Sequence, residues 1–424
     1  MAFLAGSEHH SESEQQAAED RPSTGKNPPQ RILYAAGPGD LVGECRHLAA
    51  GKEPPFQLGL SFSQQFLEVC DAAGIQAHLI SWHPRRDSLQ FGAHRLENRP
   101  QPALYYAGGL RHYFGAVLYG LGLVAQAVRE RPTVVIVDSG TTRWFVLSLL
   151  RLFRIPVIAV LYSALWPRGF PPQRRFERLL LAMDAWFFRR AAAATVCMSP
   201  ELERQVRTVA KDPSVVFLPF RPLYRRQFLS RVPPVSQPPF RPFHVLFLGR
   251  VEEFKGVFLI LSMAERLEAE MPGGFNWRII GAGSAFDTLQ AQIRARNLSR
   301  IVEARGLLPS EAAAIETLGW AHAMVVPTTS QFKEGLAMTA VESVLAGRPV
   351  VLSDVVPAWE ILGGAAIKVD TDDLDGFVAA FRRLAQDADY YEQHRRATAG
   401  VQAQFYDPSE GLGAALMRAL AALR

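Results

Sequence analysis

The segment FKEGLAMTAVESVLAGRPVV, residues 332–351, contains two glutamates, Glu334 and Glu342, separated by seven residues. An apolar strand pattern precedes the segment, and a helix pattern starts soon after Gly335. Free amides at the start of such a helix attract an anion such as a phosphate. Glu342 lies in the first turns of this helix, where a carboxylate can accept both hydroxyls of a ribose. The spacing therefore fits a nucleotide that carries a polyhydroxylated group, with Glu334 beyond the phosphates.

Each glutamate taken singly has a simpler explanation. Glu342 has the position of an ordinary surface residue of a helix, and Glu334 that of an acidic partner for the helix dipole. A nucleotide site therefore needs support from other motifs.

Two cations follow another strand pattern, in FLGRVEEFKG, residues 247–256. The strand ends at Gly249, and Arg250 and Lys255 stand in the loop before the next helix. Arginine can bind two oxygens of a diphosphate and lysine adds a mobile charge, each charged hydrogen bond contributing about 1.5–3 kcal/mol. In the alternative, Arg250 pairs with a glutamate of its own loop and Lys255 faces water.

A glycine turn follows a third strand pattern, in IIGAGS, residues 279–284. Gly281 and Gly283 permit close approach of the backbone to a base or a phosphate. Because position 286 is Phe, the full G-x-G-x-x-G motif is absent, and a tight strand-to-helix turn explains the glycines equally well.

The elements that would position these residues alternate between short strand patterns and longer helix patterns, which is typical of βαβ units around a parallel sheet. The fold class is α/β, with two doubly wound, Rossmann-like domains that face each other across a ligand cleft. A proline-rich linker separates the halves. The predicted segments are a disordered tail (1–30), a first domain (31–220), the linker (221–243), a second domain (244–404) and a terminal helix that can pack back on the first domain (405–424).

Composition supports a globular protein of two domains. The chain has 424 residues, of which 48% are hydrophobic and 21% charged, and a single core stops growing at roughly 250–300 residues. Three scattered cysteines without metal spacing, and an opening MAFLAG too short for a secretory signal, favour the cytoplasm. The apolar stretch 144–166 contains Arg151 and Arg154 near its middle, which argues against a membrane-spanning helix. No metal cluster is visible.

The motifs together resemble a known family. From about residue 243 to 400 the chain looks like the donor domain of the family 4 (group 1) glycosyltransferases, which have the GT-B architecture. The resemblance rests on GR…KG, GAGS, VVPT…KEGLAMTAVESVLAGRPVV and SDVVPAWEIL, in the family's order. The family's E-x7-E motif stands here as Glu334 and Glu342.

The resemblance implies an activity and assigns roles. It implies transfer of a hexose-type sugar, with retention of configuration, from a nucleotide-diphosphate sugar to a glycan, a lipid-linked sugar or another glycoconjugate, as in polysaccharide biosynthesis. The first domain would be the acceptor side and the second the donor nucleotide-sugar domain. The donor is a substrate, and no cofactor is implied. Arg250 and Lys255 would bind the pyrophosphate, Glu342 the ribose and Glu334 the sugar. The other implied donor-binding residues are Gly249, Gly281, Gly283, Gly335, Leu336 and Ala337.

The sequence departs from the family at two places. Ala337 replaces a glycine beside the donor, and Tyr162 and Ser163 occupy the region where the family often has a histidine. In the first domain, Gly37 and Gly39 of AGPGD are candidates to offer amides to the pyrophosphate or the acceptor, or else form a structural turn.

A basic, aromatic cluster from Trp166 to Arg190 has two interpretations. It is either a helical hairpin with solvated arginines, or a peripheral contact with the inner face of an anionic membrane. The aromatic residues of that contact would be Trp166, Phe170, Trp186 and Phe187, and the arginines on lipid phosphates would be Arg168, Arg174, Arg175 and Arg178.

Two other functions compete with an enzyme of this family. A non-catalytic protein of the same fold that binds sugar nucleotides or glycans is the main rival. An oxidoreductase that uses a dinucleotide lacks its glycine fingerprint, and the basic residues do not form a recognisable nucleic-acid-binding module.

Overall fold

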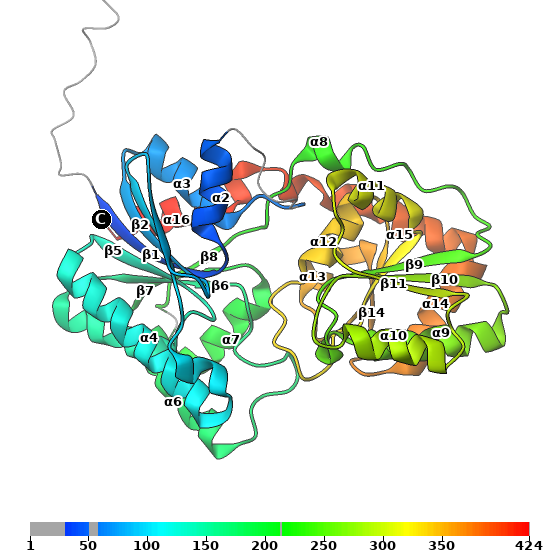
Figure 1. Ribbon diagram of the computed structural model, residues 1–424, viewed down its shortest axis with the longest axis horizontal. Helices are drawn as coiled ribbons and strands as arrows, with labels where there is room; N and C mark the ends of the chain where they lie inside the picture. The colour runs from blue at the N-terminus through cyan, green and yellow to red at the C-terminus, as the bar shows by residue number, and fades with distance from the viewer. Residues whose placement is uncertain (1–29, 51–57, 213, 424) are drawn as a thin grey trace, which may run out of the picture.

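The computed structural model describes residues 30–50, 58–212 and 214–423. The predicted disordered tail therefore lies, except for residue 30, outside the described residues. The described chain forms two sheets, one of eight strands and one of six, each covered by helices on both faces (Figure 1).

The first sheet has the strand order β3-β4-β2-β1-β5-β6-β7-β8, and only β3 runs antiparallel to its neighbour. Strands β5 and β6 are buried along their whole length, because helices cover both faces of the sheet. The strands are β1 (Arg31–Pro38), β2 (Gln76–Trp82), β3 (Asp87–Phe91), β4 (His94–Arg99), β5 (Val134–Asp138), β6 (Val157–Leu161), β7 (Ala192–Cys197) and β8 (Phe217–Pro219).

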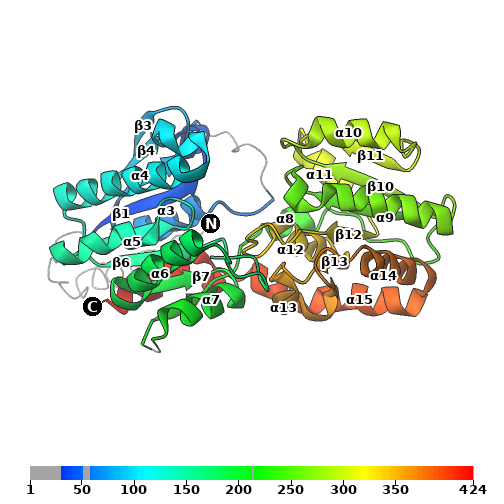
Figure 2. The ribbon, with the colours of Figure 1, turned by 90° about the horizontal axis from the view of Figure 1, so that it is seen from below.

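Two sets of helices cover the first sheet (Figures 1 and 2). On one face lie α2 (Leu41–Ala49), α3 (Phe62–Ala72) and the last helix of the chain, α16 (Leu412–Ala421). On the other face lie α4 (Gly109–Glu130), α5 (Trp144–Leu147), α6 (Arg175–Arg190) and α7 (Pro200–Ala210), with the 3-10 turns η1 (Ala103–Ala107) and η2 (Ser148–Phe153) beside them.

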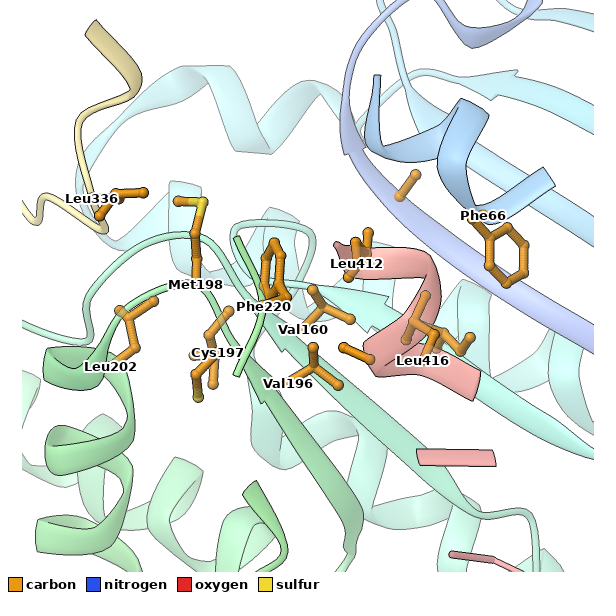
Figure 3. Packing of buried hydrophobic residues seen from close by; sticks show 14 of the residues in the cluster. Phe66, Val160, Val196, Cys197, Met198, Leu202, Phe220, Leu336, Leu412 and Leu416 are labelled. Atoms are coloured by element: carbon orange, nitrogen blue, oxygen red, sulfur yellow. The ribbon is translucent and has the colours of Figure 1, made fainter. Parts of the chain in front are cut away.

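The C-terminal helix returns to the first sheet. Leu412 and Leu416 of α16 lie among Phe66, Val196 and Phe220 of the first-domain core (Figure 3). The Leu412 amide also donates a hydrogen bond to Gln65 Oε1 over 3.2 Å. The end of the chain therefore ties the two halves together.

The second sheet has the order β11-β10-β9-β12-β13-β14 and is wholly parallel. Its strands are β9 (Phe243–Leu248), β10 (Phe275–Ile280), β11 (Val302–Arg305), β12 (Ala323–Val326), β13 (Val350–Ser353) and β14 (Ala366–Val369). Its helices are α9 (Val257–Glu270), α10 (Phe286–Ala295), α11 (Glu311–Trp320), α12 (Met338–Leu345), α13 (Ala358–Leu362), α14 (Leu374–Gln386) and α15 (Ala388–Val401). Between the two sheets the chain has one short helix, α8 (Arg226–Leu229), and the remaining 3-10 turns are η3 (Glu253–Lys255), η4 (Gly363–Ala365), η5 (Ala403–Phe405) and η6 (Pro408–Glu410). The predicted domain boundaries remain a proposal.

The direction of the crossovers reverses at one point in each sheet. In the first sheet the chain leaves β1 toward β2 and later returns to β5 on its other side, and in the second the same happens around β9, with β10 and β12. Ligands of such folds bind beyond the carboxyl ends of the strands at these reversals. The residues that follow β1, β5, β9 and β12 are therefore candidates for ligand binding.

Polar contacts join the domains near these strand ends. Arg204 Nη1 donates to Glu360 Oε2 over 2.9 Å, and Arg168 Nη1 donates to the Asp354 carbonyl over 3.2 Å. Arg168 also lies 3.5 Å from carboxylate oxygens of Glu201 and Glu360. Placing Arg168 on lipid phosphates was therefore wrong, because its guanidinium bridges the domains.

The helical hairpin proposed for Trp166–Arg190 is also wrong. Residues 166–174 form an irregular segment, and one helix, α6, follows it. The prolines at 167, 171 and 172 explain the difference, since each removes a backbone donor that a first helix would need. Within the part of the chain that the structure describes, no helix is long and apolar enough to cross a membrane.

Candidate active site

A cavity of about 670 Å³ lies between the two sheets, at the carboxyl ends of their strands. It brings predicted residues from distant parts of the chain to one place. Those from the first domain are Gly37, Gly39, Tyr162 and Ser163, and those from the second domain are Glu334, Leu336, Ala337 and Glu342.

Lys255 and Glu334 form an ion pair beside this cavity. Lys255 Nζ lies 2.5 Å from Glu334 Oε2, which also accepts a hydrogen bond from Thr328 Oγ1 over 3.2 Å. Both side chains are largely buried, so the attraction between them is screened less than at the surface. Gly256 brings Lys255 here: its φ is 77°, and a Cβ at this position would lie 2.0 Å from the Pro327 carbonyl oxygen.

Arg250 stands next to this pair without a polar partner. Its guanidinium lies 5.5 Å and 5.4 Å from the ring centroids of Phe254 and Phe332, which stack on each other at 4.7 Å. Among the described residues its side chain makes no hydrogen bond or salt bridge. The neighbouring Glu252 instead accepts hydrogen bonds from the backbone and side chain of Ser284. Arg250 therefore forms no close ion pair with the glutamates of its loop in the described structure, although its charge, after the hydrogen bonds from Ser284, contributes to lowering the pKa of Glu252. Its role in binding an anion stays a prediction.

Glu342 is buried within α12 and faces the cleft cavity. Burial raises the pKa of its carboxyl group to about 7, and the nearby Tyr224 hydroxyl partly opposes this effect. A carboxylate with its charge so poorly solvated gains from hydroxyl donors. The simpler explanation for Glu342, an ordinary surface residue, is excluded because only 8% of it is exposed.

Ala337 has a strained backbone at the start of α12. Its φ of 70° and ψ of 92° are conformations that glycine adopts easily, and for other residues such strain costs about 1–3 kcal/mol. No side chain caps this helix start, which leaves the first amides of an eight-residue helix without a cap beside the cavity. The alanine that departs from the family's glycine therefore keeps the glycine-like turn.

Three of the glycines predicted to bind the donor have a packing reason for being glycine. A Cβ on Gly281 would lie 1.8 Å from the Gly249 carbonyl oxygen, and one on Gly283 would lie 2.2 Å from the Val251 carbonyl oxygen. The loops after β9 and β10 therefore touch through their backbones. A Cβ on Gly335 would lie 1.7 Å from the Tyr162 carbonyl oxygen, across the domain boundary. Contacts of these glycines with a donor remain predictions.

Asp138, at the end of β5, is a cavity residue that the sequence reasoning missed. It accepts hydrogen bonds from the Tyr34 hydroxyl and the Gly37 amide, each over 2.9 Å. Burial raises the pKa of this carboxyl group to about 7. The signal was an aspartate that ends an otherwise apolar strand, next to the reversal between β1 and β5.

The amides predicted to bind an anion in the first domain already have partners. The Gly37 amide donates to Asp138 and the Gly39 amide to the Trp82 carbonyl over 3.0 Å. Tyr162 and Ser163, in the family's histidine region, donate their amides to Ser139 Oγ over 2.9 Å and 3.2 Å. An acceptor-side role for these residues stays a prediction. In residues 30–50, 58–212 and 214–423 no three His, Cys, Asp or Glu side chains gather as a metal site would require.

Part of the chain is similar in sequence to known glycosyl transferases. Residues 242–387 match the family model of the group 1 glycosyl transferases. A glycogen synthase from Mycobacterium tuberculosis (strain CDC 1551 / Oshkosh) is 24% identical over 278 residues. That alignment covers 63% of this chain and 63% of the relative, just under two thirds of its length.

Solved structures of similar fold cover nearly the whole chain. The sucrose-phosphate synthase from Thermosynechococcus elongatus aligns with a TM-score of 0.68 and 16% identity, over 93% of this chain and 100% of that chain. The Anabaena protein Alr3699/HepE, solved in complex with UDP and glucose, aligns with a TM-score of 0.62 and 15% identity, over 92% of this chain and 99% of that chain.

The two facing, doubly wound domains define a protein of GT-B architecture. The part of the chain that matches the group 1 glycosyl transferases, residues 242–387, carries Arg250, Lys255, Glu334 and Glu342.

Proposed function

We propose that the protein is a retaining glycosyltransferase that moves a hexose-type sugar from a nucleotide-diphosphate sugar to a glycan, lipid-linked or other glycoconjugate acceptor. One observation carries this proposal: Glu334 and the buried Glu342 line one interdomain cavity, Lys255 pairs with Glu334, and the guanidinium of Arg250 lies with Lys255 over the Phe332 ring. The match to the family and the UDP and glucose bound to Alr3699/HepE support it.

The proposed chemistry is electrostatic. As the bond from the sugar to the diphosphate breaks, negative charge develops on the leaving phosphate oxygens, and donors already aimed at them lower the barrier. Arg250, Lys255 and the first amides of α12 are those donors. The family's front-face reaction needs no protein nucleophile, so retention is consistent with a site whose donor-side residues are cations and hydrogen-bonding groups.

The ion pair gives Lys255 and Glu334 linked roles. In the structure, the ammonium group of Lys255 neutralises Glu334. A bound diphosphate competes for that ammonium group, which releases the carboxylate to accept hydroxyls of the donor sugar. Glu342 accepts the ribose hydroxyls. Binding of the complete donor therefore replaces one buried charge pair by two sets of charged hydrogen bonds.

The cellular setting forms part of the proposal. Cys45, Cys70 and Cys197 are buried and unpaired, which suits a reducing compartment such as the cytoplasm. Peripheral contact with an anionic inner membrane surface would give the enzyme access to lipid-linked acceptors.

A thermal-shift screen of UDP, GDP and ADP, each with its sugar conjugates, tests donor binding. We expect one diphosphate to raise the melting temperature, since a ligand at about 100 times its Kd stabilises by about 2.7 kcal/mol. Arg250→Ala should abolish the shift, while Arg300→Ala, an exposed arginine of the same domain, should keep it. Stabilisation by NAD(P) instead would contradict the proposal. If the protein binds the donor but releases no diphosphate with any acceptor tested, the alternative is favoured, a non-catalytic protein that binds sugar nucleotides or glycans.

Binding of the diphosphate should tighten as pH rises from about 6 to about 8. The folded-state pKa of Glu342 is raised to about 7, so ionising this carboxyl group costs stability as pH approaches 7. Ribose hydroxyls favour the ionised form, so affinity should rise about tenfold across this window. Calorimetric titration with the diphosphate at several pH values measures this dependence for the native protein and for the variants Glu342→Gln and Asp138→Asn. Glu342→Gln should lose the slope and Asp138→Asn should keep it; the reverse pattern would assign the titration to Asp138.

A further inference from the structure

Large exposed apolar side chains are concentrated on one part of the first domain. The described residues include sixteen of them, and fourteen lie between Leu104 and Trp186. A soluble monomer rarely gathers its exposed apolar surface in this way, and such patches mark interaction sites. The remaining two, Val216 and Leu307, lie elsewhere.

Helix α4 contributes an apolar stripe on its outer side. Leu110, Phe114, Leu118 and Leu121 are 70%, 56%, 38% and 41% exposed, and their spacing of three or four residues places them on one face. The inner face of α4 is already packed on the sheet through other apolar residues. A helix that is apolar on both sides needs a second apolar environment.

Helix α6 and the turn η2 extend this stripe. Phe176, Leu179, Met183 and Trp186 form the exposed row of α6, and Leu152 of η2 is 78% exposed. The rings of Tyr113 in α4 and Phe176 in α6 lie 5.3 Å apart. Figure 2 shows α4, α5 and α6 side by side. We call the exposed apolar side chains of α4, η2 and α6, with the arginines around them, the α4–α6 face.

Positive charge surrounds the apolar side chains of this face. Residues 103–130, 144–154 and 166–190 contain ten arginines and only three acidic residues, an excess larger than the +5 of the whole chain. One of the three, Asp184, is buried and paired with Arg143. Arg174, Arg175 and Arg178 are exposed at the N-terminal end of α6, and Arg189 and Arg190 at its other end. The rest of the chain is net negative.

We propose that the α4–α6 face docks on the surface of an anionic lipid bilayer. Apolar side chains enter the boundary between head groups and acyl chains while arginines bind lipid phosphates. The docking surface differs from the cluster suggested by the sequence. Phe187 is fully buried against Trp144, at 5.5 Å between ring centroids, and Arg168 joins the domains, whereas α4 and η2 supply much of the apolar area.

A second copy of the chain fits this surface poorly. A twofold interface would bring the nine exposed arginines of residues 103–130, 144–154 and 166–190 against an identical set, and like charges facing each other oppose association. The cores of protein interfaces are also depleted of charge, whereas here arginines border the apolar rows closely. Acidic lipid head groups satisfy both features.

If the protein is a glycosyltransferase as proposed above, docking on a bilayer also indicates the chemical class of its acceptor. A second cavity of about 620 Å³ lies beside the α4–α6 face and is lined by Tyr113, Trp166 and Phe170, with Lys333 from the second domain. It shares Ser139 and Ser163 with the cleft cavity. Its wall includes Arg143, whose buried Nε has no hydrogen-bond partner among the described residues. The acceptor is therefore an amphiphile, with its polar head in this cavity and its chain in the bilayer.

Co-sedimentation with vesicles tests the docking surface. We expect the protein to bind phosphatidylcholine vesicles that contain phosphatidylglycerol, to bind pure phosphatidylcholine much less, and to be released by high salt. Leu152→Glu and the double variant Arg175→Glu/Arg178→Glu should each lower the partition coefficient by about tenfold or more. Leu307→Glu and Arg300→Glu are the matched controls: Leu307 is 76% exposed, as Leu152 is 78%, but lies in the second domain.

Each outcome decides the proposal. Equal binding by face and control variants, or no binding to anionic vesicles at low salt, overturns the docking surface. A stable dimer in light scattering that Leu152→Glu abolishes would assign the face to a second copy instead. Diphosphate-induced thermal stabilisation should be the same in all four variants, so loss of donor binding can be distinguished from loss of membrane docking.

A transfer assay tests the acceptor class. Radiolabel from the stabilising nucleotide sugar should enter the organic phase when membrane lipid extract is supplied, and label confined to water-soluble glycan would contradict an amphiphilic acceptor.

Discussion

Replacing Lys255 by alanine should lower turnover by about 10²–10³-fold, the loss seen when one preorganised donor to a developing oxyanion is removed. Replacing Glu334 by alanine should lower turnover by about 10²-fold, because the sugar loses the acceptor that positions it. The two side chains form the ion pair beside the cleft, and the proposed mechanism uses each of them in a different bond. Release of nucleoside diphosphate in the presence of acceptor measures the effect. The two variants should also differ in binding. Lys255→Ala should lose thermal stabilisation by the diphosphate, whereas Glu334→Ala should keep it but no longer distinguish the sugar conjugate.

A purely structural role for the pair makes a different prediction. Removing one partner leaves the other as a largely buried, unpaired charge, which costs about 3–5 kcal/mol. The double variant Lys255→Met/Glu334→Gln keeps the volume and removes both charges. If activity returns in the double variant along with stability, the pair only supports the fold. We expect the double variant to be stable and inactive, with Arg300→Ala as a fully active control.

Gly335→Ala should abolish productive closure of the cleft while leaving each domain folded. The added Cβ would lie 1.7 Å from the Tyr162 carbonyl oxygen and 2.5 Å from its carbon, distances that only a backbone shift can relieve. Tyr162 is held at the end of β6, because its amide donates to Ser139 Oγ. The domains must therefore move apart, and displacement of reacting groups by about 1 Å costs about 10²-fold in rate.

The matched control for Gly335→Ala is Gly306→Ala. Gly306 has no atom within 4 Å of an added Cβ, so the same chemical change should be silent there. Small-angle scattering should show a larger radius of gyration for Gly335→Ala, and the melting temperature should change little. Full turnover by Gly335→Ala would mean that the cleft works without this contact.

Local patterns in the sequence determined much of the architecture. The apolar runs that became β5, β6, β12 and β13 predicted buried parallel strands, and alternation with helix patterns predicted the two doubly wound domains. The positions of Arg250, Lys255 and Glu334 at strand ends follow from the same patterns. These features depend on residues close in sequence, where periodicity and turn residues carry the physical information.

Long-range packing decided the rest. The sequence could not say whether Glu342 was exposed, that Lys255 meets Glu334 across 79 positions, or that Asp138 lies in the same cavity. The sequence also predicted that Phe187 is exposed, whereas it is buried, and it did not predict the exposed apolar stripe of α4. Burial, and with it the pKa of a carboxyl group or the exposure of a leucine, depends on which elements cover a residue. The sequence alone therefore determined the fold class and the residue types available for chemistry, whereas the tertiary structure decided which of them share one cavity and which face outward.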